Sequence, residues 1–302
     1  MGKTVFMFPG QGAQYVGMGK DFYEQIPVCK EMFELAGKAS GLDVAALCFE
    51  ENERINITEY TQIAMLATEV AILKAVEEKG VKPDITGGLS LGEYGALVAS
   101  GVMSPEDAFK IVRKRGIYMQ EAVPQGGAMI AVLGLDTAVI EQICEETPGM
   151  VTIANYNCPG QIVITGEEGA AQAAMEKLTA AGAKRCVPLK VSGPFHSPLL
   201  TGAGEKLAKE LETVEIHDIA VPYIANVTAD YVKDKADVKP LLEKQVSSSV
   251  KWQQTVERMI ADGADTFIEI GPGKTLSGFM RKINRDVKVI NIEKVEDLQK
   301  LL

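Results

Sequence analysis

A serine lies at the centre of the pentapeptide Gly88-Leu89-Ser90-Leu91-Gly92. This G-x-S-x-G pattern is meaningful where a strand runs into a helix, because its glycines permit a tight turn that exposes the serine Oγ at the start of the helix. Residues 81–89 are expected to form a strand, and residues 91–99 a helix. We therefore predict that Ser90 is a nucleophile; the alternative is a plain glycine turn.

A serine nucleophile needs a general base, and histidine is the usual one because its ordinary pKa lies near neutral pH. Of the two histidines, His196 lies in a loop of glycine and proline, whereas His217 lies in an ordinary polar connection. We predict His196 as the base, with a purely structural role as the alternative, and place His217 at the surface. The 41 acidic residues give no basis for choosing a third member, and a backbone carbonyl could orient the imidazole equally well.

Arg115 follows Arg113 and Lys114 in a segment expected to be helical from about Pro105. On composition alone, a solvated basic face is the simpler interpretation. The functional alternative is a bidentate clamp on a substrate carboxylate. The residues themselves leave both open.

Two glycine loops resemble nucleotide-binding motifs but fail at a required position. The segment Gly271-Pro272-Gly273-Lys274-Thr275 is similar to the end of a Walker A loop, but the first glycine of that motif would be residue 268, which is Ile. Gly10 and Gly12 lack the third glycine of a dinucleotide fingerprint, because residue 15 is Tyr. The sequence supports neither ATP nor dinucleotide binding.

The order of elements predicts an α/β fold that holds these motifs. Residues 127–192 have the order strand, helix, strand, strand, helix, strand, which is the ferredoxin-like pattern. The outer segments resume short strands between helices. We expect a large discontinuous α/β domain of residues 1–126 and 193–302, with a small ferredoxin-like domain of residues 127–192 inserted in it. The expected outer strands cover residues 5–8, 81–89, 221–226, 266–270 and 287–292, and the expected helices include 61–79 and 91–99.

Length and composition exclude several classes of protein. The chain has 302 residues, of which 46% are hydrophobic and 24% charged, as in globular proteins of one large or two ordinary domains. Its net charge of −10 repels phosphodiester backbones, so we expect no nucleic-acid partner. The five cysteines form no C-x-x-C pair, so we expect neither disulfides nor a metal site. This cysteine usage favours a protein of the reducing cytoplasm. No segment approaches the roughly 18 apolar residues of a membrane span.

Six motifs, in order from the first strand to about residue 285, together resemble the malonyl-CoA:acyl carrier protein transacylase family. They are Phe8-Pro9-Gly10-Gln11-Gly12-Ala13-Gln14, Ser90-Leu91-Gly92-Glu93-Tyr94, Arg115-Gly116 with Met119-Gln120, Asn155-Tyr156-Asn157-Cys158-Pro159-Gly160-Gln161, Pro194-Phe195-His196-Ser197 and Gly271-Pro272-Gly273-Lys274. The resemblance implies a large domain related to α/β hydrolases with an inserted ferredoxin-like domain, and an active site in the cleft between the two.

The resemblance also implies roles for the catalytic residues. Ser90 is acylated, His196 is its base, and Arg115 holds the free carboxylate of the malonyl group. The backbone amides of Gln11 and Leu91 form the oxyanion hole. An acetyl group would then leave the guanidinium unpaired in a desolvated cleft, so the enzyme should select malonyl over acetyl.

Further positions follow from the same resemblance. The backbone carbonyl of Gln245 orients the histidine, while Phe195, Asn155 and Gln62 belong to the substrate site. Phe195 is similar to the residue of malonyl-selective members. Two departures are visible: Leu89 replaces the usual histidine, and Ser248-Ser249 replaces an Asn-Pro pair before Val250, which affects the turn that presents the Gln245 carbonyl.

The implied reaction is ping-pong transfer of malonyl from malonyl-CoA to acyl carrier protein in fatty acid synthesis, by a cytoplasmic monomer that needs no cofactor. Because acyl carrier protein is acidic, a local basic surface should receive it. Candidates are Lys184, Arg185 and Lys190 on one side, and Arg281, Lys282 and Arg285 on the other. The alternatives are a polyketide-pathway acyltransferase, a serine thioesterase or esterase, and a non-catalytic module that docks carrier protein.

Overall fold

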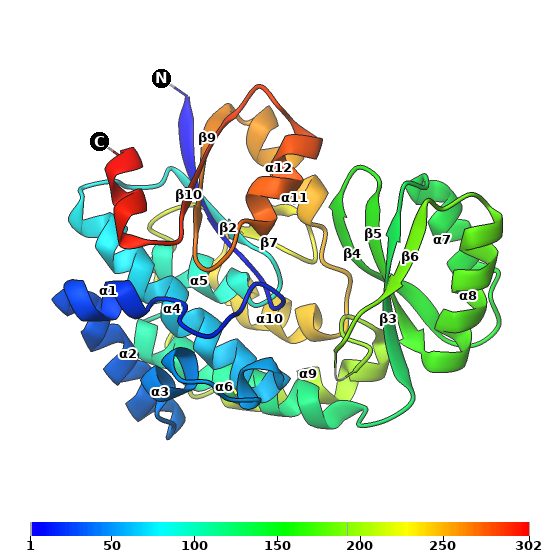
Figure 1. Ribbon diagram of the computed structural model, residues 1–302, viewed down its shortest axis with the longest axis horizontal. Helices are drawn as coiled ribbons and strands as arrows, with labels where there is room; N and C mark the ends of the chain where they lie inside the picture. The colour runs from blue at the N-terminus through cyan, green and yellow to red at the C-terminus, as the bar shows by residue number, and fades with distance from the viewer. Residues whose placement is uncertain (1, 192, 302) are drawn as a thin grey trace.

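The computed structural model describes residues 2–191 and 193–301, and two four-stranded sheets with their helices account for most of them (Figure 1). The first sheet is parallel, with the strand order β10-β9-β1-β2. Its strands are β1 (Lys3–Phe8), β2 (Ile85–Gly88), β9 (Ala264–Ile270) and β10 (Lys288–Ile292). The mixed α/β class predicted from the sequence is confirmed.

Both faces of the parallel sheet are buried. In β1, Phe6 and Phe8 belong to one apolar cluster, whereas Val5 and Met7 belong to a second cluster that includes Trp252. Successive side chains of a strand point to opposite faces, so a strand covered on both sides is apolar at every position. This explains why the short apolar run near the start of the chain becomes an inner strand.

Helices surround this sheet, and α4 is the most deeply buried of them. It lies against α2 and α6, and nearly all of its side chains from Thr58 to Val76 are buried. Among the helices of the described residues, none combines the length and apolar character that a membrane crossing requires. The helices of this part are α1 (Lys20–Gln25), α2 (Pro27–Ser40), α3 (Val44–Phe49), α4 (Thr58–Glu78), α5 (Gly92–Ala99), α6 (Pro105–Ala122), α9 (Thr201–Leu211), α10 (Val238–Val246), α11 (Trp252–Ala261) and α12 (Thr275–Ile283), with 3₁₀ turns η1 (Arg54–Asn56), η2 (Pro198–Leu200), η3 (Lys235–Asp237) and η4 (Val295–Leu301).

The second sheet is antiparallel, has the order β4-β5-β3-β6, and forms the green unit at the right of Figure 1. Its elements follow one another in the predicted order, and α7 and α8 pack with the sheet around a separate apolar core. The predicted end of the small domain, residue 192, lies outside the described residues, as do the chain ends 1 and 302. The elements are β3 (Gly127–Leu133), α7 (Thr137–Glu145), β4 (Val151–Cys158), β5 (Gln161–Glu167), α8 (Glu168–Ala180) and β6 (Arg185–Pro188).

Two predicted strands are wrong in extent. The strand expected over residues 81–89 is confined to β2, and the one expected over 221–226 is reduced to β7 (Ile224–Ala225), which pairs with β8 (Asp230–Tyr231) in a separate hairpin. A proline lies in each lost part, at positions 83 and 222, and proline has no N–H to donate to a neighbouring strand. Among the described residues, the one backbone bridge between this segment and the edge of the parallel sheet joins Tyr223 to Thr86.

Strand β4 connects the two units. Val250 N–H donates to Ala154 O at 2.8 Å, and Tyr156 N–H donates to Val250 O at 2.9 Å. The segment after α10 therefore runs along the edge of β4. This contact links the second sheet to α10, the helix that carries Gln245.

Candidate active site

Ser90 occupies a strained turn between β2 and α5. Its φ is +55°, a value that L-residues other than glycine rarely adopt. A Cβ at residue 88 would lie 1.9 Å from Gly92 O, and one at residue 92 would lie 2.1 Å from Phe8 O. The chain can therefore cross so closely over β1 only with glycine at these two positions. The strand, turn and helix predicted around Ser90 are present.

Asn226, which directly follows β7, supports this turn, and no motif in the sequence indicates its role. The Ser90 N–H donates to Asn226 Oδ1 at 2.6 Å, and Asn226 Nδ2 donates to Gly88 O at 2.7 Å. Its side chain is fully buried. One signal was available: a buried asparagine in an otherwise apolar run must find hydrogen-bond partners, since an unsatisfied amide is costly to bury.

His196 lies next to Ser90, with its Nε2 2.7 Å from the serine Oγ. Its Nδ1 lies 2.9 Å from Gln245 O. A carbonyl oxygen only accepts, so Nδ1 carries the hydrogen and Nε2 is free to accept from the Ser90 hydroxyl. Burial, with a further contribution from Arg115, lowers the pKa of His196 from 6.5 to about 4, so the imidazole is neutral near pH 7.

The two members of this pair share an unusual backbone conformation. The non-glycine residues with positive φ in the described part of the chain are Ser90, His196, at +59°, and Ala229. Strained backbone of this kind costs of order 1–3 kcal/mol per residue and persists where the surrounding structure holds it. Two of the three instances therefore coincide with the predicted nucleophile and base.

Arg115 projects from α6 into the same site and is only 1% exposed, so the interpretation as a solvated basic face is wrong. Its Nη2 donates to Ser90 Oγ at 3.0 Å and to Gln245 Oε1 at 2.9 Å. Its Nη1 donates to Gln62 Oε1 at 2.7 Å, which places Gln62 beside the guanidinium. Burial lowers the pKa of Arg115, but arginine stays charged at neutral pH.

The contacts of the guanidinium bear on the expectation that an acetyl group would leave it unpaired. Nη1 and Nη2 already donate to neutral oxygens of Gln62, Ser90 and Gln245. Nε is buried and has no hydrogen-bond partner among the described residues. Within the described part of the chain no carboxylate contacts Arg115 directly, so its charge is available to an anionic group.

Gln245 contributes its side chain as well as its backbone carbonyl, which the sequence did not indicate. Its Nε2 donates to Ser90 O at 3.0 Å and to Glu93 Oε2 at 2.6 Å. The departure at Ser248 and Ser249 leaves a turn in place, because Ser248 N–H donates to Gln245 O at 3.4 Å and Ser249 Oγ donates to Ile153 O at 2.6 Å. The carbonyl is thus presented to His196 without the Asn-Pro pair.

Gln11 and Leu91 lie in the two loops that meet at Ser90. Within the described residues, no hydrogen bond occupies the backbone N–H of either residue. The side chain of Gln11 is held by a bond from its Nε2 to Thr58 Oγ1 at 3.0 Å. Both amides are therefore available to an oxygen of a bound group, as an oxyanion hole requires.

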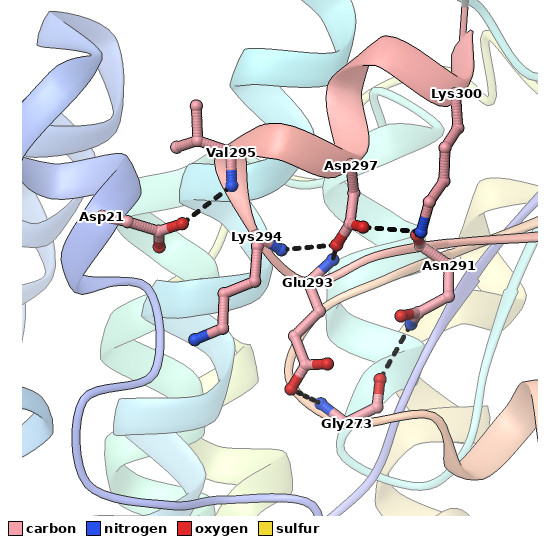
Figure 2. A network of polar contacts seen from close by, with 8 residues as sticks. All are labelled: Asp21, Gly273, Asn291, Glu293, Lys294, Val295, Asp297 and Lys300. Atoms are coloured by element: carbon pink, nitrogen blue, oxygen red, sulfur yellow. Dashed lines mark hydrogen bonds and ion pairs between the residues drawn. The ribbon is translucent and has the colours of Figure 1, made fainter.

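Figure 2 shows how the C-terminal segment holds the turn at Gly273 through Asn291 and Glu293. Glu293 Oε1 accepts the Gly273 N–H at 3.0 Å, and Asn291 Nδ2 donates to Gly273 O at 2.8 Å. A Cβ at residue 273 would lie 3.3 Å from the Cβ of Ala13, so this loop packs closely beside the Gln11 loop. The turn that resembled a Walker A loop thus contacts the Gln11 loop.

Other predicted residues are not brought to the serine by a direct contact. Phe195 is buried in the main core and precedes His196 in the chain, whereas Asn155 of β4 pairs with Val163 of β5 and bridges to Val250. Leu89 is half-buried against the second apolar cluster. His217 is exposed, with 47% of its side chain accessible, as predicted.

The six basic residues suggested for docking are all exposed: Lys184, Arg185, Lys190, Arg281, Lys282 and Arg285. Lys282 Nζ reaches Gln161 Oε1 at 3.2 Å, so α12 and β5 approach each other there. Across residues 2–191 and 193–301, no group of three or more His, Cys, Asp or Glu side chains is arranged to hold a metal ion.

Several known proteins are similar to this chain in sequence and in architecture. Residues 5–297 match the family described as acyl transferase domain. The malonyl CoA-acyl carrier protein transacylase of Bacillus subtilis (strain 168) is 46% identical over 304 residues, covering 99% of this chain and 96% of that protein. The crystal structure of MCAT from Streptococcus pneumoniae is 48% identical, with a TM-score of 0.95 and 99% of each chain covered. A malonyl-transacylase solved in complex with its type II PKS acyl-carrier protein is 38% identical, with a TM-score of 0.96 and 99% of each chain covered.

Proposed function

The chain belongs to the acyl transferase domain family, and from this premise we propose that it transfers malonyl from malonyl-CoA to the phosphopantetheine thiol of acyl carrier protein. One observation carries the proposal: Ser90 Oγ lies within hydrogen-bond distance of both a neutral imidazole and a buried guanidinium. A nucleophile, its base and a cation for a carboxylate therefore meet at one atom.

The first half-reaction makes a malonyl ester on Ser90. Its Oγ attacks the thioester carbonyl while His196 Nε2 takes the hydroxyl proton, and the N–H groups of Gln11 and Leu91 hold the developing oxyanion. When the tetrahedral intermediate collapses, the C–S bond breaks and the imidazolium returns its proton to the CoA sulfur. The carbonyl of Gln245 accepts from Nδ1 throughout, which keeps the ring in the required tautomer.

The second half-reaction reverses these steps with a different thiol. The phosphopantetheine thiol of the carrier protein gives its proton to His196 and attacks the ester carbon, and the Ser90 oxygen leaves and takes the proton back. Both halves use the same residues, so the transfer is ping-pong. No cofactor takes part in this scheme.

Arg115 selects the acyl group in this proposal. The malonyl carboxylate would form a charge-assisted pair with the buried guanidinium, which an acetyl group cannot form. Gln62 on one side and Gln245 on the other hold the guanidinium beside Ser90. Phe195 and Asn155 are proposed to shape the acyl and CoA regions of the same site.

The finer description of the fold and setting belongs to the same proposal. The strand order β4-β5-β3-β6 with α7 and α8 supports an inserted ferredoxin-like domain, and the parallel sheet with the Ser90 turn supports a relation of the large part to α/β hydrolases. The six exposed basic residues in and next to β6 and α12 are candidates for receiving the acidic carrier protein. We further propose a monomer that acts in the cytoplasm.

Two other functions compete with fatty acid synthesis. A polyketide-pathway acyltransferase would use the same chemistry. This alternative is supported by the related structure of a malonyl-transacylase in complex with its type II PKS acyl-carrier protein. A serine esterase would pass the acyl group to water, but the buried Arg115 beside the nucleophile favours a carboxylated acyl group. The set of Ser90, His196 and Arg115 also argues against a non-catalytic docking module.

Intact-protein mass spectrometry tests the function directly. Wild-type protein mixed with malonyl-CoA should gain a malonyl adduct, Ser90→Ala should not, and added holo carrier protein should take the adduct over. Steady release of malonate to water without transfer would indicate a hydrolase. No adduct and no turnover would overturn the enzymatic assignment.

A further inference from the structure

Glu93 is a buried carboxylate beside the site that the scheme above does not use. It lies in the first turn of α5, three residues after Ser90, and is 1% exposed. Its Oε2 accepts from Gln245 Nε2 at 2.6 Å and from Asn226 N at 3.1 Å. Both partners also hold the Ser90 turn.

The Gln245 side-chain amide connects this carboxylate to Arg115. Its Oε1 accepts from Arg115 Nη2 at 2.9 Å, while its Nε2 donates to Glu93 Oε2. An amide offers an acceptor at one end and donors at the other. A cation on the oxygen and an anion on the nitrogen therefore fix its orientation, and the backbone carbonyl of the same residue holds His196.

We infer that Glu93 is a positioning residue whose negative charge balances Arg115, weakening the hold on the malonyl carboxylate and stabilising the imidazolium that forms at His196. The inference rests on the proposed function. Glu93 touches neither the substrate nor the reacting atoms. It acts through Gln245 and through its field among buried side chains, where charges interact more strongly than in water.

The two effects of this charge act on different steps. Two anions repel, so an ionised Glu93 opposes binding of the malonyl carboxylate but leaves binding of an acetyl group unaffected. An anion near His196 favours its protonated form, so it speeds the attack of Ser90 on the thioester. A merely structural role would change the binding of both acyl groups alike.

Glu93→Gln removes the charge while keeping the shape and one acceptor oxygen. In a Ser90→Ala background, calorimetry should show malonyl-CoA binding tighter to the Glu93→Gln protein by on the order of tenfold, with acetyl-CoA binding unchanged. In the protein that retains Ser90, rapid-quench mass spectrometry should show acylation slower by on the order of tenfold in the same variant. Equal changes for both ligands, or no change in the acylation rate, would overturn the inference.

Glu69→Gln is the matched control. Glu69 is also a fully buried glutamate of the large part, but neither of its carboxylate oxygens has a hydrogen-bond partner among the described residues. Its substitution should leave the preference between the two ligands and the acylation rate at their wild-type values. A wild-type protein that accepts no malonyl group would instead refute the proposed function. Failure of the proposed function can therefore be told apart from failure of the Glu93 inference.

A measurement that does not need the Glu93 variant uses the Ser90→Ala protein alone. Burial raises the pKa of Glu93 to about 7. The pKa of His196 is about 4, because burial lowers it. Burial raises the pKa values of Tyr94 and Tyr223 well above the ordinary value for tyrosine. Of these four groups, Glu93 is the one whose charge changes near pH 7. Calorimetry in buffers of different ionisation enthalpy should show proton uptake with malonyl-CoA and none with acetyl-CoA, and equal proton uptake for both would contradict the inference.

Discussion

Asn226 lies 136 residues after Ser90 in the chain, yet its side-chain oxygen accepts the Ser90 backbone N–H at 2.6 Å. Together with its bond to Gly88 O, this contact spans the turn in which φ of Ser90 is +55°. The hairpin of β7 and β8 is therefore a support for the nucleophile. The same asparagine donates its own N–H to Glu93, so the turn and the buried carboxylate share one anchor.

Replacing Asn226 tests this support. Asn226→Ala leaves the buried Ser90 N–H and Gly88 O without their partners, which should lower the free energy of unfolding by about 1–3 kcal/mol. Because the strained turn would relax, the acylation rate should fall further than the loss of stability explains at a temperature where the variant is folded. Denaturant unfolding and single-turnover acylation measure the two effects.

Asn226→Asp is the companion variant, because it retains an acceptor for the Ser90 N–H, although it loses the donor to Gly88 O and adds a buried carboxyl group beside Glu93. With this carboxyl group protonated, at mildly acidic pH, it should lose less activity than Asn226→Ala. Equal acylation rates in wild type and Asn226→Ala would show that the Ser90 turn keeps its conformation without the Asn226 side chain.

Arg115→Ala should reduce the preference for malonyl-CoA over acetyl-CoA in acylation by on the order of 100-fold, since removing one partner of a buried charge pair costs about 2–5 kcal/mol. The substitution removes the cation and leaves the Gln62 and Gln245 oxygens without their donor. Competition between the two acyl-CoA substrates, read by the mass of the Ser90 adduct, gives the ratio directly.

Arg113→Ala is the control for Arg115, because Arg113 lies on the same helix and its guanidinium contacts Glu59 instead. It should keep the wild-type preference. If Arg115→Ala also kept it, the carboxylate would have to be recognised elsewhere.

His196 should make the protein less stable in mild acid. Its pKa is about 4 in the folded state and 6.5 ordinarily, so between these values the unfolded chain binds a proton that the folded protein does not. Stability therefore falls as pH drops through this range, and the contribution lost between pH 7 and pH 5 is about 2 kcal/mol. Denaturant unfolding at both pH values should show a smaller difference in His196→Gln than in wild type by that amount.

His217→Gln provides the comparison for that experiment, because His217 is largely exposed. It should show the wild-type dependence of stability on pH. An equal dependence in His196→Gln would mean that the buried imidazole titrates as an exposed one does.

Glu293→Ala should slow acylation by disturbing the Gln11 loop from behind. The variant leaves the Gly273 N–H without its acceptor, and the Gly273 turn packs against Ala13, two residues after Gln11. An oxyanion donor that shifts loses part of its effect on the transition state but little on ground-state binding. We expect a several-fold lower acylation rate with unchanged malonyl-CoA affinity in the Ser90→Ala background. Glu296→Ala, which changes an exposed neighbour, should have the wild-type acylation rate. A wild-type acylation rate in Glu293→Ala would show that Glu293 does not affect the Gln11 loop.

Features that depend on local pattern could be predicted from the amino-acid sequence alone. The glycines around Ser90, the expected strand before it and the helical pattern after it predict a turn that the structure contains, because each requirement involves residues close together in the chain. The same holds for the elements of residues 127–188, where turn residues and hydrophobic periodicity separate strands from helices. Two further local signals bear on the outer strands: prolines shorten two of them, and Asn226 interrupts an apolar run.

Tertiary structure decided the contacts between distant segments and the burial that gives them their strength. Arg115 was indistinguishable from a surface residue until α6 placed it beside Ser90 with 1% exposure. The side chains of Asn226, Gln245 and Glu93 reach the serine turn from three elements, and no spacing in the sequence records that meeting. Because the energy of a charge or an amide depends on what replaces its water, only packing decides which polar residues belong to the site.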